Sequence, residues 1–203
     1  MKFQKKIKWI ILMILLSAGM GQAIAKPPLE VTDLVPAREL ADDSVLKPGL
    51  LPIYIYKLFK YVEEMPELDI KTTTEKVCKP ILFLDHHFGK KDLIFDSGVS
   101  QGIGIQMTGF LKFSEPGKYT LKTLSNDGIT VWVCDKRIVW DSGVHPDHVS
   151  DEVVLDIQKP GWYLLKIKYF QRIGTAAIAI YWKLPGKTNF SVIPAEAYSH
   201  EPV

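Results

Sequence analysis

The chain has 203 residues, of which 47% are hydrophobic and 24% are charged. It is too apolar for a disordered tail and too long for a disulfide-stabilised miniprotein, so one ordinary globular domain is expected. The formal net charge of +2 excludes the strongly basic surface that would make nucleic acid the first candidate partner.

The first 25 residues predict a secretory signal peptide. Four lysines lie within the first eight residues, an uncharged and largely apolar stretch follows from Trp9, and Ala23–Ala25 ends with small residues at the two positions that a signal peptidase reads. The strongly apolar part is shorter than the roughly 20 residues that cross a bilayer, which disfavours an uncleaved anchor. We therefore expect a secreted or periplasmic protein with no membrane span after cleavage and with a slightly acidic mature chain.

Residues 26–47 are rich in proline and acidic side chains and predict an irregular N-terminal arm. Residues 48–203 alternate apolar and polar side chains, the pattern of strands with one buried face, and a weak helical pattern occurs only at residues 54–64. Close turn signals between these runs predict an all-β fold, a jelly-roll-like antiparallel sandwich. The side chains expected to line one face of each strand are Ile53 and Ile55, Ile103, Ile105 and Met107, Tyr119, Leu121 and Thr123, Ile129, Val131 and Val133, Val153, Leu155 and Ile157, Tyr163, Leu165, Ile167 and Tyr169, and Ile178, Ile180 and Trp182.

Two segments of the chain are similar to each other. Pro116-Gly117 and Pro160-Gly161 each open a strand that begins with an aromatic residue, Tyr119 in the first and Tyr163 in the second. Proline presets the first turn angle and glycine accepts a positive φ at the second. We expect both strands to enter the same core.

An exported protein also raises the question of whether Cys78 and Cys134 form a disulfide. Closing that loop would stabilise the fold by roughly 4 kcal/mol on the chain-entropy model. Two unrelated buried thiols are the alternative, because spacing alone does not show that the residues are close.

Residues 109–182 carry their motifs in a particular order. In sequence they are the first Pro-Gly and aromatic pair, Ser125-Asn126-Asp127-Gly128, Val131-Trp132-Val133, Trp140-Asp141, the second such pair and Tyr169-Phe170-Gln171. This order resembles the PA-fourteen domain family, the β-sandwich named after the anthrax toxin protective antigen and also found in yeast flocculins and secreted glycosidases. The resemblance covers roughly residues 48–198.

The resemblance implies a site at one end of the sandwich. In carbohydrate-binding members of the family, two adjacent aspartates joined by a cis peptide hold a calcium ion that holds sugar hydroxyls. The matching positions are Asn126 and Asp127, where asparagine keeps an oxygen but removes a charge, so calcium should bind more weakly. A second loop would add the side-chain oxygen of Gln171, although Arg172 beside it would repel a cation. A plain hairpin turn is the alternative reading of residues 126–128.

Tryptophans are candidates for stacking on sugar rings. Trp182 shares a strand face with apolar residues and is expected in the core, whereas Trp132 and Trp140 are better candidates for exposure. The expected ligand-binding residues are thus Asn126, Asp127, Gln171 and Trp140.

Histidines form two clusters, His86-His87 and His145-Pro146-Asp147-His148. Such clusters can bind zinc or act as acid and base, but the proline opposes the helical geometry that would make the second spacing converge, so both are read as loops. No G-x-S-x-G or H-E-x-x-H motif is present, and acidic residues in surface loops are the ordinary case, so no enzyme is expected.

These observations predict a secreted, non-catalytic and lectin-like carbohydrate-binding module, with calcium as an accessory ion. Its partner would be a glycan or cell-surface polysaccharide. The alternative is a structural or adhesive module that contacts another exported protein through the sandwich face or the N-terminal arm.

Overall fold

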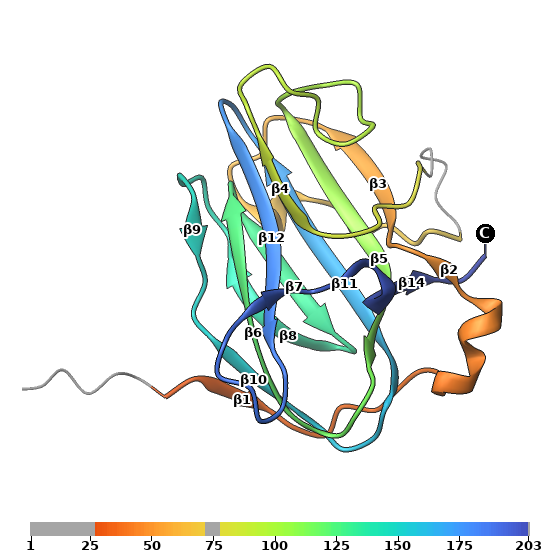
Figure 1. The fold of residues 1–203 in the computed structure, drawn as a ribbon. Helices are drawn as coiled ribbons and strands as arrows, with labels where there is room; N and C mark the ends of the chain where they lie inside the picture. Colours follow the sequence, from red (N-terminus) through yellow and green to blue (C-terminus); the bar gives the residue numbers. More distant parts are fainter. Residues whose placement is uncertain (1–26, 72–77, 203) are drawn as a thin grey trace, which may run out of the picture.

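The computed structural model describes residues 27–71 and 78–202, so the expected signal peptide lies outside the described residues. Two β-sheets pack face to face and enclose the core (Figure 1). This confirms the predicted sandwich. Within the described part of the chain, no helix is long and apolar enough to cross a membrane.

The first sheet has the order β1-β10-β6-β12-β13, with β4 paired to β12 and β9 paired to β6. Its strands are β1 (Leu29–Val31), β4 (Asp85–Phe88), β6 (Gly117–Asn126), β9 (His148–Val149), β10 (Val153–Ile157), β12 (Ala176–Lys183) and β13 (Ser191–Val192).

The second sheet has the order β2-β14-β5-β11-β7-β8, with β3 paired to β5. Its strands are β2 (Lys47–Pro48), β3 (Leu51–Tyr56), β5 (Ile103–Phe113), β7 (Ile129–Val133), β8 (Lys136–Asp141), β11 (Gly161–Gln171) and β14 (Tyr198–His200). Within residues 27–71 and 78–202, short 3-10 helices lie between strands at η1 (Leu40–Val45), η2 (Val62–Glu64) and η3 (Ala195–Ala197).

The alternation of apolar residues predicts the buried positions of most strands. From β5 to β12, each side chain expected on the core face is at most 8% exposed, and Trp182 lies in the core as expected. β3 is the exception, because Tyr54 belongs to the central core, whereas Ile55 packs against a separate cluster with Phe59 on the outer side of the sheet. Apolar residues occupy both faces of this strand, so alternation could not identify the core face.

The two similar Pro-Gly segments do enter one core. The ring of Phe113 lies 4.7 Å from that of Tyr119 in the first sheet and 5.2 Å from that of Tyr163 in the second, measured between centroids. Both contacts are edge-on, the arrangement that aromatic quadrupoles favour. This aromatic group therefore joins the two sheets at the end where β6 and β11 begin.

The N-terminal arm contains regular elements that the sequence did not predict. Leu29–Val31 form β1, which pairs in parallel with β10, and η1 follows at Leu40–Val45. Three residues are too few to show a period, so no pattern could predict this strand. The weak helical pattern at residues 54–64 does not correspond to a helix of that length. β3 continues to Tyr56, and within this range only η2 is helical.

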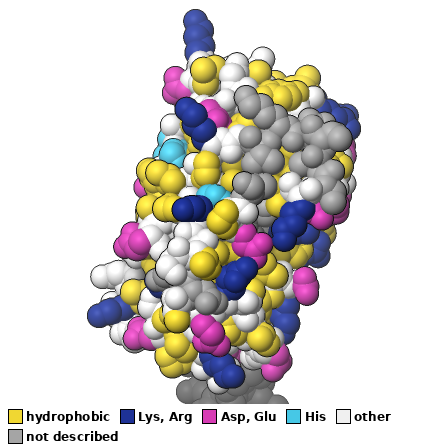
Figure 2. All heavy atoms as spheres, turned by 90° about the vertical axis from the view of Figure 1, so that its right-hand side faces the viewer, with side chains coloured by type: hydrophobic (Ala, Val, Ile, Leu, Met, Phe, Trp, Pro, Cys, Tyr) yellow, Lys and Arg dark blue, Asp and Glu magenta, His cyan; other side chains and the backbone are white. Residues whose placement is uncertain are grey.

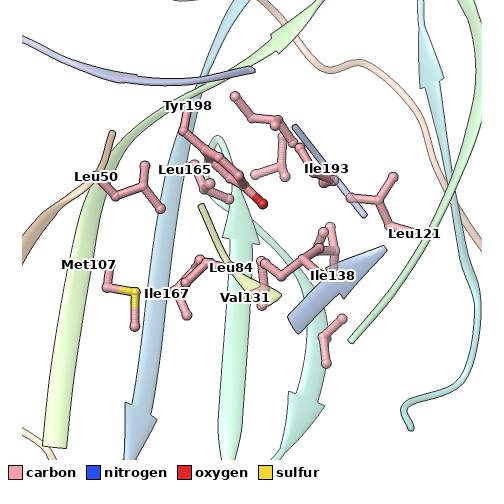
Figure 3. Packing of buried hydrophobic residues seen from close by; sticks show 14 of the residues in the cluster. Leu50, Leu84, Met107, Leu121, Val131, Ile138, Leu165, Ile167, Ile193 and Tyr198 are labelled. Carbon is pink, nitrogen blue, oxygen red and sulfur yellow. The ribbon is translucent and has the colours of Figure 1, made fainter. Parts of the chain in front are cut away.

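Tyr198 reaches from β14 into the aliphatic core (Figure 3). Its hydroxyl group is buried and has no hydrogen-bond partner among the described residues. Burial raises the pKa of Tyr198 well above its ordinary value, because the ionised form would lack water. The hydroxyl has therefore lost its hydration without gaining a partner.

Replacing Tyr198 with phenylalanine should raise the free energy of unfolding by about 1 kcal/mol, because the unpartnered hydroxyl is removed and the ring is kept. Tyr163→Phe is the matched control. The Tyr163 hydroxyl donates to the carbonyl of Lys159 at 2.6 Å, so its removal should cost about 1 kcal/mol. Urea denaturation of both variants measures the difference, and equal losses would contradict this account of Tyr198.

Candidate functional site

The candidate site begins where β6 ends. The peptide bond between Asn126 and Asp127 is cis, as the resemblance implied, and β7 starts two residues later at Ile129. Gly128 lies between them in very close contact with its surroundings. A Cβ on Gly128 would be 2.5 Å from the carbonyl oxygen of Ser142 and 2.7 Å from the ring of Phe170. Only glycine allows these three segments to approach so closely.

Asp127 fastens two loops to this turn. One carboxylate oxygen accepts a hydrogen bond from the backbone N–H of His145 at 3.2 Å, and the other accepts one from the N–H of Arg172 at 2.7 Å. The backbone N–H of Asp127 itself donates to the carbonyl of Phe170. Burial raises the pKa of Asp127, although the two backbone hydrogen bonds oppose this effect. The carboxylate therefore holds the loop after β8 and the loop after β11 in place.

Asn126 is held by a neighbouring acidic residue. Its side-chain amide donates to the Asp147 carboxylate at 2.9 Å and to the Thr175 hydroxyl at 3.4 Å. Its backbone carbonyl accepts a hydrogen bond from the Tyr169 hydroxyl at 2.6 Å. An aspartate at position 126 would face Asp147 as a second anion, so asparagine suits this surrounding better.

Gln171 completes the predicted group. It is fully buried, and its amide N–H donates to the carbonyl of Thr175 at 3.0 Å. Its side-chain oxygen is buried without a hydrogen-bond partner among the described residues. Thr175 contacts both Gln171 and Asn126, so the structure brings Asn126, Asp127 and Gln171 together. Sequence reasoning missed Asp147 and Thr175 as partners of these residues, and only the folded loops reveal them.

Trp140 is exposed, as expected, but its contacts lie on the outer face of β8. Its side chain is 60% exposed, its indole N–H donates to Glu63 at 2.6 Å, and Arg137 lies 4.6 Å above its ring. The two predicted elements of the site, the turn and the tryptophan, are therefore held by different neighbours.

The second histidine cluster holds a loop. Nδ1 of His148 lies 2.5 Å from one carboxylate oxygen of Asp141, and Nε2 of His145 lies 3.2 Å from the other. His87 lies 3.8 Å from Asp147. Among residues 27–71 and 78–202, no three His, Cys, Asp or Glu side chains are grouped so that they could hold a metal ion. The contacts are those of a loop rather than of a zinc site.

No disulfide joins Cys78 to Cys134. The backbone of Cys78 contacts Pro52 of β3, and that of Cys134 contacts Leu164 of β11 at the end of β7. β5 and β11 lie between β3 and β7, which separates the two residues by three strand spacings, on the order of 14 Å. A disulfide needs Cα atoms within about 7 Å of each other, a distance that this arrangement of strands does not provide.

The oxygen atoms of the site are of the kind that calcium takes. Asp127 and Asp147 supply charge, Asn126 and Gln171 supply amide oxygens, and the unpartnered Gln171 oxygen lacks a donor or cation. Both carboxylate oxygens of Asp127 already accept backbone hydrogen bonds, which limits what they offer a cation. These residues fit a weak calcium site rather than a strong one.

Two cavities lie on the outer face of the second sheet. The larger, about 770 Å³, extends over β5, β7 and β11 and is lined in part by Leu164 and Trp132. The smaller, about 270 Å³, includes Glu63, Arg137 and again Trp132.

A third cavity, about 1040 Å³, lies between the N-terminal segment at residues 27–30 and strands β8 to β10, and Trp140 lines it. None of these three cavities is lined by Asn126, Asp127 or Gln171. The three residues of the turn and the following loop therefore lie outside these three cavities.

The sequence matches a known family model. The family model described as "PA14 domain" matches residues 86–196, more than half of the chain. No curated protein matches the sequence.

Solved structures share the fold at low identity. An anti-sigma factor domain-containing protein superposes with a TM-score of 0.60 at 15% identity over 77% of this chain, which spans about half of that protein (48%). A PA14 sugar-binding domain from an RTX adhesin gives 0.53 at 15% identity, covering 75% of this chain and 98% of the other. The epithelial adhesin 9 A domain from Candida glabrata, in complex with Galβ1-4GlcNAc, gives 0.58 at 10% identity, covering 83% and 96%.

The cis peptide at residues 126–127, the two-sheet architecture and the family match agree with one another. The chain belongs to the PA14 domain family.

Proposed function

We propose that the chain is an exported, non-catalytic module that binds carbohydrate through the loops at residues 126–128, 142–148 and 171–175. The observation that carries the proposal is the side-chain oxygen of Gln171, buried without a partner in the same cluster as Asn126 and Asp127. A buried carbonyl oxygen is costly to leave unpaired, so a ligand hydroxyl or a cation would stabilise it. The sugar-binding domains of similar fold support the class of ligand.

The loops supply the remaining contacts. Val144 and Ile173 are 51% and 59% exposed and stand next to His145 and Arg172, whose backbone groups Asp127 holds. Exposed aliphatic side chains offer an apolar surface to the C–H groups of a sugar ring, while Asp147 offers a hydrogen-bond acceptor. When bound, calcium would coordinate both the site oxygens and sugar hydroxyls.

A glycan array probed with the purified protein, with calcium and with a chelator, tests the proposal. We expect binding to a restricted set of glycans, weakened by chelator and by Asp127→Ala. The chelator would remove calcium, and the substitution removes the carboxylate that accepts hydrogen bonds from the two loops. Asp147→Asn is the companion variant. Its side chain is 52% exposed, so it removes a charge next to Asn126 with little effect on the fold.

Loss of binding in Asp147→Asn with an unchanged melting temperature would place the ligand at this turn. Absence of binding to every glycan, with folded protein, would overturn the proposal.

The alternative, a structural or adhesive module that contacts another protein, is favoured by one observation. The three cavities described above lie on the sheet face and beside the N-terminal arm, away from Asn126, Asp127 and Gln171. A folded protein indifferent to glycans, chelator and Asp127→Ala would support this alternative.

A further inference from the structure

We propose that the outer face of the second sheet carries another carbohydrate-binding surface, centred on Trp132, that binds a neutral oligosaccharide chain. Trp132 lines both the cavity of about 770 Å³ and the cavity of about 270 Å³, so the two hollows meet at its ring. The inference rests on the proposed carbohydrate binding for its class of ligand, but not on the loop site. We call the two hollows together the sheet-face trough.

The smaller hollow has polar walls that are already ordered. Lys168 is almost completely buried and donates to Glu67 at 2.7 Å and to the carbonyl of Met65 at 3.1 Å. Burial raises the pKa of Glu67, but the hydrogen bonds from Lys168 and Lys166 outweigh it, so the pKa lies below its ordinary value. Ordered polar groups bind a ligand at a low entropic cost.

Glu63 is ordered in the same way on the other side of this hollow. Its carboxylate accepts hydrogen bonds from the Trp140 indole N–H at 2.6 Å and from the Ser142 hydroxyl. Arg137, which also lines the hollow, stacks on the ring of Trp140. Carboxylate and guanidinium groups can form hydrogen bonds with the hydroxyl groups of a sugar, and an aromatic ring can pack against its apolar face.

The larger hollow has exposed apolar side chains in its wall. Leu164 lines it and is 49% exposed, Phe110 forms part of its wall, and the Lys166 ammonium lies 4.5 Å from the centre of the Trp132 ring. A half-exposed leucine beside a tryptophan provides a surface for further sugar units. With volumes of about 770 and 270 Å³, the two hollows together offer room for more than one sugar unit.

The charges of the trough balance. The smaller hollow has two acidic and two basic side chains, Glu63, Glu67, Arg137 and Lys168. The larger also has two acidic and two basic ones, Asp135, Glu201, Lys71 and Lys166. The face of the molecule that Figure 2 displays carries side chains of both signs interspersed with hydrophobic ones. A surface without net charge favours a neutral ligand over a polyanion.

An extended peptide is a poorer match. β5, β7 and β11 are each paired on both sides, so their backbone N–H and C=O groups already have partners. A peptide bound by strand addition needs a free edge, which the floor of the trough does not offer. Side chains alone would recognise the ligand, as they do for sugars.

Affinity electrophoresis tests the inference with soluble polysaccharides: a mixed-linkage glucan, an arabinoxylan, a galactomannan and dextran, with polygalacturonate as the acidic comparison. We expect at least one neutral polymer to retard the protein, and Trp132→Ala to weaken the interaction by about tenfold or more. Leu164→Glu is the second variant. It places a charge at a half-exposed position, so it should also abolish retardation without disturbing the core.

Leu93→Glu is the matched control, because Leu93 is 56% exposed and lines none of the three cavities. Retardation that survives Asp127→Ala and chelator but fails in Trp132→Ala and Leu164→Glu would support the trough. Retardation lost in Asp127→Ala and kept in both trough variants would overturn it and support the loop site. No retardation by any neutral polymer, or retardation only by polygalacturonate, would also overturn it.

Discussion

Gly128→Ala should lower the free energy of unfolding by about 3 kcal/mol, because the added methyl group overlaps its neighbours. Its Cβ would lie 2.5 Å from the carbonyl oxygen of Ser142 and 2.7 Å from the ring of Phe170. Neither neighbour can move easily, since the first is backbone and the second is a fully buried side chain. Chemical denaturation with urea measures the change.

Gly143→Ala is the control for this substitution. Gly143 lies in the loop that Gly128 contacts, but a Cβ there would meet no atom within 4 Å. Its effect should stay below about 0.5 kcal/mol. Similar losses in the two variants would show that the close approach at Gly128 is not what constrains the turn.

Asp127→Ala should cost about 2–4 kcal/mol, because the backbone N–H groups of His145 and Arg172 would lose their acceptor in a largely buried place. Asp127→Asn should cost roughly half as much, since its amide oxygen can still accept one of the two hydrogen bonds. Urea denaturation gives the total change. Hydrogen exchange at the amides of His145 and Arg172 should accelerate in the same order.

Asp147→Ala separates this effect from a general loss of negative charge at the turn. Asp147 is exposed, accepts a hydrogen bond from the side chain of Asn126 and lies 3.8 Å from His87. It does not bind the amide of His145 or Arg172, so its removal should leave both amides protected. Unchanged exchange at His145 and Arg172 in Asp127→Ala would show that the carboxylate does not hold the two loops.

The sequence predicted the sandwich because its signals are local. Alternation along β5, β6 and β11 identifies their buried faces, and the two Pro-Gly turns place Tyr119 and Tyr163 at the starts of strands that meet at Phe113. Each of these signals spans only a few residues. β3 resisted the same reasoning, because it is apolar on both faces.

The candidate site was predictable only in part. The resemblance located Asn126, Asp127 and Gln171, which the structure brings together. The partners that hold them, Asp147 and Thr175, come from loops whose positions no periodicity describes. The sheet-face trough also escaped prediction, because it depends on the segment that carries Glu63 and Glu67 folding back over the second sheet.

β1 has a consequence for how copies of the molecule meet. Leu29–Val31 cover the side of β10 that would otherwise present unpaired N–H and C=O groups, and such open borders are templates for pairing between chains. The covering strand is only three residues long and follows Pro27 and Pro28, whose nitrogens carry no hydrogen to donate. The edge of this sheet is thus a three-residue strand next to two prolines, which offers few backbone groups for pairing with another chain.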